Sequence, residues 1–135
     1  MSILDRNSKA NSGYYQETPK SLHIDERQIV RDLMDEFFLV FGGFLRVYED
    51  GRATRPANEH RPIRDYRPSG GHFDRKGEMI CPYDLTVGEF CYRMYDEFGL
   101  TVEVATRDNR VLIPPEIALE YVQVIRTAAD IRRFL

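Results

Sequence analysis

Arginine–proline pairs recur at a regular spacing in the middle of the chain, and the chemistry that they favour is the recognition of anions. The pairs are Arg55–Pro56, Arg61–Pro62 and Arg67–Pro68, six residues apart. Because proline disfavours the α region for the residue before it, each arginine is expected in extended backbone. A polyproline II stretch has three residues per turn, so this period places the three guanidinium groups on one edge. Such groups bind carboxylates and phosphates through paired hydrogen bonds.

Basic and ring-bearing side chains around the pairs complete a candidate binding surface. Its residues are Arg55, Arg61, Arg64, Arg67, Tyr66, His60 and His72. At ~3.1 Å per residue, successive arginines of an extended stretch lie about 19 Å apart, much wider than the phosphate spacing along one nucleic-acid strand. This spacing favours carboxylates as the anions, and they belong either to a partner protein or to this chain. Nucleic acid is the alternative partner, because the ring side chains could stack on unpaired bases.

Cationic side chains are concentrated in this part of a chain that is acidic as a whole. The net charge is −3, whereas residues 52–76 contain seven cationic and three acidic side chains. A net negative charge argues against nucleic acid, since a basic face usually dominates nucleic-acid-binding domains. The arginines could also pair with acidic helix faces of their own chain, and exposed pairs of this kind are worth about 0–1 kcal/mol each.

A second set of side chains could support catalysis or bind a metal ion. It comprises His60, His72, Asp74 and Cys81, which offer imidazole, carboxylate and thiol groups. General acid–base catalysis needs such groups within hydrogen-bond reach, and the sequence does not bring them together. Their spacing matches no zinc pattern, and no other catalytic motif is found. We therefore expect no metal and no cofactor, and an enzyme with a site near these four residues is kept as a further alternative.

Length and composition predict one domain with a real hydrophobic core. The chain has 135 residues, of which 42% are hydrophobic and 12% aromatic. No apolar run approaches the ~20 residues that a membrane helix needs, and the N-terminus lacks a signal-peptide pattern. We expect a cytoplasmic protein without membrane contact. Cys81 and Cys91 are interpreted as reduced thiols in the core.

The N-terminal part of the chain predicts a tail and then a helix. Residues 1–23 carry no apolar period and are interpreted as a disordered tail, so that a single domain spans 24–135. A helical stripe over 25–41 ends at a glycine pair and has an aromatic end at Phe37, Phe38 and Phe41. Because this end is apolar nearly all round, it is either deeply buried or an oligomer seam.

The remaining pattern predicts two hairpins and two further helices. Residues 44–48 and 52–55 are interpreted as the first hairpin, which is followed by a long basic loop over 56–78 and a short strand over 78–81. Thr86 and Glu89 form a capping box at the start of a helix that Gly99 ends. Residues 100–105 and 111–113 form the second hairpin, and Pro114–Pro115 opens the last helix.

This order predicts an α+β domain in which a small antiparallel sheet of two hairpins is covered by three helices. The repeated helix-then-hairpin order suggests two similar halves, although their sequences show no convincing similarity. The function expected from the whole pattern is that of a non-enzymatic binding or accessory protein. Its partner is another protein or a second copy of itself, contacted through the arginine–proline loop.

Overall fold

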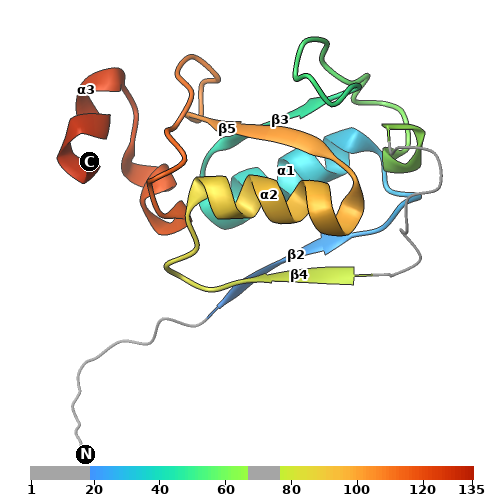
Figure 1. Ribbon diagram of the computed structural model, residues 1–135, viewed down its shortest axis with the longest axis horizontal. Coiled ribbons are helices and arrows are strands. Elements are labelled where there is room, and N and C mark those ends of the chain that lie inside the picture. The colour runs from blue at the N-terminus through green and yellow to red at the C-terminus, as the bar shows by residue number, and fades with distance from the viewer. Residues whose placement is uncertain (1–18, 67–76) are drawn as a thin grey trace, which may run out of the picture.

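The structure is a computed structural model that describes residues 19–66 and 77–135, and it confirms the α+β class (Figure 1). The first half contains β2 (Lys20–Ile24), α1 (Val30–Phe41), β3 (Phe44–Tyr48) and the 3₁₀ helix η1 (Ile63–Tyr66). The second half contains β4 (Gly77–Cys81), α2 (Val87–Phe98), β5 (Thr101–Ala105) and the 3₁₀ helix η2 (Leu119–Val124). The chain then ends in α3 (Ala128–Ile131) and the 3₁₀ turn η3 (Arg132–Phe134).

Two antiparallel two-stranded sheets lie on opposite sides of the helix pair α1–α2 (Figure 1). Strand β2 pairs with β4, and β3 pairs with β5, so each sheet takes one strand from each half. The inner faces of both sheets and the facing stripes of both helices form one hydrophobic core. At its centre the rings of Phe37 and Phe90 lie 5.3 Å apart, which joins the two helices directly.

The two halves are related by a pseudo-two-fold axis. The difference in residue number between Val30 and Val87, the first residues of α1 and α2, also separates β2 from β4 and β3 from β5. The same difference pairs Leu22 with Met79 and Arg46 with Glu103, and these are also partners across the two sheets. Residues that face their own equivalents in this way mark the places where a two-fold axis crosses each sheet.

Buried positions repeat between the halves although the sequences do not. The buried residues of α1 are Val30, Leu33, Phe37 and Phe41, and their equivalents Val87, Phe90, Met94 and Phe98 are the buried residues of α2. Each helix ends at a glycine in the left-handed region, Gly42 at φ 74° and Gly99 at φ 70°. The duplication suggested by the element order is therefore visible in the architecture, where it rests on hydrophobic pattern rather than on residue identity.

The free edges of sheet β2–β4 are covered in equivalent ways with opposite charges. The carboxylate of Glu36 on α1 accepts a hydrogen bond from the N–H of His23, at 2.8 Å. At the equivalent place Arg93 on α2 donates through Nη1 to the carbonyl of Ile80, also at 2.8 Å. A charged helix side chain thus occupies each edge, which hinders pairing with a strand of another molecule.

Several element boundaries differ from the sequence expectations. The predicted tail reached residue 23, but Lys20–Ile24 is a strand; the earlier part of that tail lies outside the described residues. Helix α1 starts at Val30 rather than at Asp25, because Asp25 and Gln28 close a separate turn through two hydrogen bonds. The predicted return strand over 52–55 is shifted, and pairing with β3 occurs instead around Pro56.

The predicted last helix is also wrong in its first part. Residues 114–117 form a turn, in which the N–H of Ile117 donates to the carbonyl of Pro114 at 3.2 Å, and the carbonyls of Pro115 and Ile117 accept hydrogen bonds from the first two N–H groups of α2. These carbonyls therefore accept hydrogen bonds from α2 and are not available for a helix that starts at Pro115.

Within the described residues, no helix is long and apolar enough to cross a membrane.

Candidate functional site: the arginine–proline segment

Residues 52–66, called here the arginine–proline segment, are fixed to the domain through their main chain. The N–H groups of Val30 and Arg31 at the start of α1 donate to the carbonyls of Arg61 and Glu59, at 3.0 and 2.8 Å. The N–H of Ile63 donates back to the carbonyl of Gln28 at 2.9 Å. The segment thereby supplies the acceptors that the first turn of a helix needs.

The other end of the segment is attached to strand β3. The N–H of Glu49 donates to the carbonyl of Arg55 at 2.8 Å, and the N–H of Ala57 donates to the carbonyl of Val47 at 2.9 Å. Between these attachments Ile63 is fully buried in the core. Of the loop predicted over 56–78, residues 56–62 form no helix or strand, residues 63–66 form the 3₁₀ helix η1, and residues 67–76 lie outside the described residues.

Arginine side chains of the segment form ion pairs with carboxylates close by. Arg55 pairs with Glu49 at 2.9 Å, and Arg61 pairs with Asp65 at 2.8 Å. Their side chains are nevertheless 74% and 61% exposed. The acidic partners belong to the segment and its flank, not to the outer faces of the helices as the intramolecular alternative expected. On α1 the polarity is reversed, because Arg31 of the helix pairs with Glu59 of the segment.

The ring residues of the predicted surface have different surroundings. Tyr66 is half-buried, and its hydroxyl accepts a hydrogen bond from the N–H of Asn58 at 3.0 Å, so this ring is committed to the packing of the segment. His60 is exposed, as are Arg52 and Arg64. Arg67 and His72, the remaining predicted contacts, lie outside the described residues.

The predicted oligomer seam is mainly part of the core. Phe37 is fully buried and Phe41 is 4% exposed, so the buried alternative holds for both of these rings. Phe38 is 39% exposed, and the guanidinium of Arg107 lies 5.4 Å from the centre of its ring. Phe38 is therefore the member of the predicted seam that a second molecule could contact.

Of the four residues of the enzyme alternative, the structure describes His60, which is exposed, and Cys81. Cys81 is fully buried on the inner face of β4, and burial raises the pKa of its thiol to about 11. A thiol in this state is protonated at neutral pH and is a poor nucleophile. His72 and Asp74 lie outside the described residues. Across residues 19–66 and 77–135, no group of three or more His, Cys, Asp or Glu could hold a metal ion.

Comparison of the chain with protein-family models, with curated proteins and with solved structures finds no match. The interpretation of the segment therefore depends on its geometry. The attachment of the segment to α1 was not predicted from the sequence, although one signal was present. Ile63 is a single large apolar residue among charged and polar neighbours, and this pattern is typical of an anchor that enters the core.

Proposed function

We propose that this protein is a non-enzymatic binding or accessory protein that contacts an acidic surface of a partner protein through the arginine–proline segment. One observation supports the proposal above all. The main chain of the segment is fixed at both ends, whereas its guanidinium groups at Arg55 and Arg61 remain 74% and 61% exposed. A fixed backbone with exposed charged groups is the arrangement that recognition of a complementary surface requires.

The energetics of the segment are consistent with this role. Ordering a flexible loop at an interface lowers affinity, and a segment that is ordered before binding avoids most of that cost. Exposed ion pairs such as Arg55–Glu49 contribute only about 0–1 kcal/mol each, so a guanidinium group can exchange its carboxylate partner at little expense. Arginine is also enriched among the residues that dominate binding energy at protein interfaces.

The proposal is tested by neutralising the exposed arginines of the segment together. In the variant R52Q/R55Q/R61Q/R64Q we expect the protein partners captured by the wild-type chain from a lysate of its own cells to be lost. The control is R126Q/R132Q/R133Q, which removes three exposed arginines near the C-terminus and should leave capture unchanged. Equal loss in both variants would indicate a nonspecific charge effect and would contradict the proposal.

Nucleic acid as the partner predicts a different result. Binding to phosphates releases counterions, so the affinity would fall steeply as salt is added. The ion pairs within the segment, together with the net charge of −3, favour a protein surface instead. A gel-shift titration with single-stranded and duplex oligonucleotides at low salt separates the two. A shift that the fourfold glutamine variant abolishes would replace the proposed function with nucleic-acid binding.

A further inference from the structure

The outer edge of strand β5, which faces away from β3, is paired over only part of its length. The N–H of Thr106 donates to the carbonyl of Val111, and the N–H of Ile113 donates to the carbonyl of Val104, both at 2.9 Å. The next two residues are prolines, which have no N–H group to donate. The segment that pairs with this edge therefore ends at Ile113.

The main-chain groups of Val102 lie on the same edge, beyond the last of these hydrogen bonds. Alternate residues of an antiparallel strand direct their N–H and C=O groups to the same side, so Val102 points outward as Val104 does. Val47, its partner across the sheet, agrees with this, because its carbonyl accepts from Ala57 on the opposite edge. Within the part of the chain that the structure describes, no group bonds to the outward N–H and C=O of Val102 or to the N–H of Val104.

A cavity of about 450 Å³ lies beside this open part of the edge. It is lined by Val102 and Val104 of β5, by Gly88 and Cys91 near the start of α2, and by residues 112–115, and most of these side chains are apolar. Ligand sites in proteins have volumes of roughly 300–1,000 Å³ and mostly apolar walls, so the cavity is suited to an apolar group of a bound molecule.

Two exposed tyrosines extend the helical side of this surface. Tyr92 and Tyr95 follow Gly88 and Cys91 by four residues each, so they lie one turn further along the same face of α2. Tyr92 is 66% exposed and Tyr95 is 56% exposed. Tyrosine is enriched among the residues that dominate binding energy at protein interfaces. The open edge, the cavity and the two rings together therefore offer more than a small-molecule pocket.

The pseudo-two-fold axis relates the cavity to bulkier positions in the first half. The equivalents of Gly88 and Cys91 are Arg31 and Met34, which have longer side chains. At Gly88 a larger residue would not fit, because an added Cβ would lie 2.8 Å from the Cβ of Pro115. One scaffold thus has large side chains at these positions in the first half and small ones beside the cavity.

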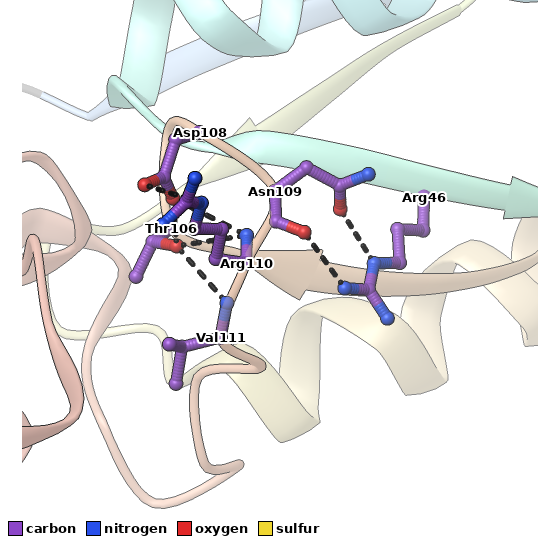
Figure 2. Close-up of polar contacts among 6 residues, drawn as sticks. All are labelled: Arg46, Thr106, Asp108, Asn109, Arg110 and Val111. Atoms are coloured by element: carbon purple, nitrogen blue, oxygen red, sulfur yellow. Dashed lines mark hydrogen bonds and ion pairs between the residues drawn. The ribbon is translucent and has the colours of Figure 1, made fainter.

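A hydrogen-bonded turn, part of which Figure 2 shows, fixes the segment that pairs with β5. The buried hydroxyl of Thr106 donates to Asp108 at 2.7 Å and accepts from the N–H of Val111 at 3.2 Å. Arg46 on β3 donates to the side chain of Asn109 at 2.6 Å and to its carbonyl at 3.1 Å. The paired segment is held in one register, so the open edge and the cavity exist before any ligand arrives.

We propose that this surface binds an extended peptide segment of a partner protein, which adds a strand to the open edge of β5 and places an apolar side chain in the cavity. The outward groups of Val102 and Val104 supply main-chain hydrogen bonds, and the cavity selects the side chain. A peptide main chain offers both the donor and the acceptor that these groups need, whereas a purely apolar small molecule would leave them unpaired. The site is separate from the arginine–proline segment and does not depend on the function proposed for it.

Titration of the full chain with an acetylated and amidated heptapeptide of alternating valine and threonine, followed by two-dimensional ¹H–¹⁵N NMR, tests the proposal. We expect saturable shifts of amides around the cavity, such as those of Gly88 and Cys91. Hydrogen exchange of the Val102 and Val104 N–H groups should slow in the complex, because they gain partners. Shifts that do not saturate, or that lie elsewhere on the molecule, would overturn the proposal.

Modified peptides separate strand addition from simple filling of the cavity. One peptide is N-methylated at its valines and the other at its threonines, so both keep every side chain. Because only alternate residues of an added strand face β5, one of the two should bind roughly tenfold more weakly than the unmodified peptide and the other about equally. If both bound as well as the unmodified peptide, the site would be an apolar cavity only, and the proposal would fail.

Two variants of the protein locate the site. Cys91→Met introduces the side chain of the equivalent Met34 into the cavity wall and should weaken peptide binding roughly tenfold. The fourfold glutamine variant of the arginine–proline segment is the control and should bind the peptide as the wild-type chain does. Loss of binding in that control, or unchanged binding in Cys91→Met, would refute the proposal. If Cys91→Met does not fold, the two methylated peptides decide the question on the wild-type chain.

Discussion

At the scale of single residues, Thr106 shows how much structure one polar group can determine. It is a fully buried polar residue between β5 and the turn that follows. Its hydroxyl takes part in three hydrogen bonds, as donor to Asp108 and as acceptor from Arg110 and Val111. A buried polar group is tolerated only when it is paired in this way, and here the pairing also directs the chain back along β5.

Removing this hydroxyl should therefore destabilise the whole domain. Thr106→Val keeps the shape of the side chain but removes the acceptor of the Val111 N–H, whereas the N–H of Arg110 still donates to Asp108 Oδ1 at 3.2 Å. Leaving a buried donor unpaired costs about 1–3 kcal/mol. Thr106→Ser keeps the hydroxyl and should cost clearly less. Urea unfolding at pH 7 measures both. Equal destabilisation by the two variants would mean that the methyl group, and not the hydrogen bonds, is what matters at this position.

The neighbouring carboxylate should make this turn sensitive to acid. The hydrogen bond from the Thr106 hydroxyl, with smaller contributions from the N–H and the charge of Arg110, holds the pKa of Asp108 below its ordinary value. The unfolded chain then binds a proton more readily, so the contribution of Asp108 to stability is present above a pH of about 4 and is lost as the pH falls through the lowered pKa.

Asp108→Asn tests this sign directly. The variant should be less stable than the wild-type chain at pH 7, and the difference in urea midpoint should shrink towards zero as the pH falls below about 4 and through the lowered pKa of Asp108. Asp96→Asn, on the exposed face of α2, serves as the control for a simple change in net charge. A difference that stays constant over this pH range would show that the ionised carboxylate is not what stabilises the turn.

At the scale of elements, local signals predicted helices α1 and α2 well, but not the last helix. The apolar stripe and the closing glycines located α1 and α2, and the capping box of Thr86 and Glu89 is present with both of its hydrogen bonds. Helix α1 lacks such a cap, and carbonyls of the arginine–proline segment accept its first N–H groups instead. A start that depends on residues about thirty positions away leaves no local signature, which explains the misplaced N-terminus of this helix.

Strand partners could not be predicted for the same physical reason. The turns that the sequence predicts after β3 and β5 are present. In each half the chain then pairs with its own strand at one isolated bridge, Tyr48–Pro56 in the first half and Ala105–Leu112 in the second. The main pairings, β2 with β4 and β3 with β5, join residues far apart in the chain. Such pairing depends on packing against the helices, because the alternation of apolar residues fixes which face is buried but not which strand lies alongside.

The arginine–proline segment should behave as part of the fold in a stability measurement. Ile63→Ala removes a fully buried side chain and should cost about 2–5 kcal/mol, as for other large apolar residues truncated in a core. Arg64→Ala, at the next and exposed position, should change the free energy of unfolding by less than about 0.5 kcal/mol. Urea unfolding of both variants compares them. A small effect of Ile63→Ala would return the segment to the status of a loosely attached loop.

At the scale of the whole molecule, the pseudo-two-fold architecture makes each half depend on the other. Both described sheets are formed across the two halves, and the core residues Phe37 and Phe90 join the two helices. Neither half, taken alone, contains a paired sheet from this set. The two halves share one backbone arrangement but differ in their surface features. The first half presents the exposed arginines of the arginine–proline segment, and the second half contains a cavity.

This dependence predicts that the domain opens as a single cooperative unit. Leu22→Ala in β2 removes a fully buried side chain on the symmetry axis and should cost about 2–5 kcal/mol. In native-state hydrogen exchange, the protection of amides in the distant sheet β3–β5 should fall by the same free energy as that of amides in β2–β4, because neither sheet survives separation of the halves. Leu135→Ala, at a position 70% exposed, is the matched leucine control and should leave both sheets unchanged. If the β3–β5 amides kept their protection in Leu22→Ala, the two sheets would open separately, and the duplication would describe two adjacent units instead of one interlocked domain.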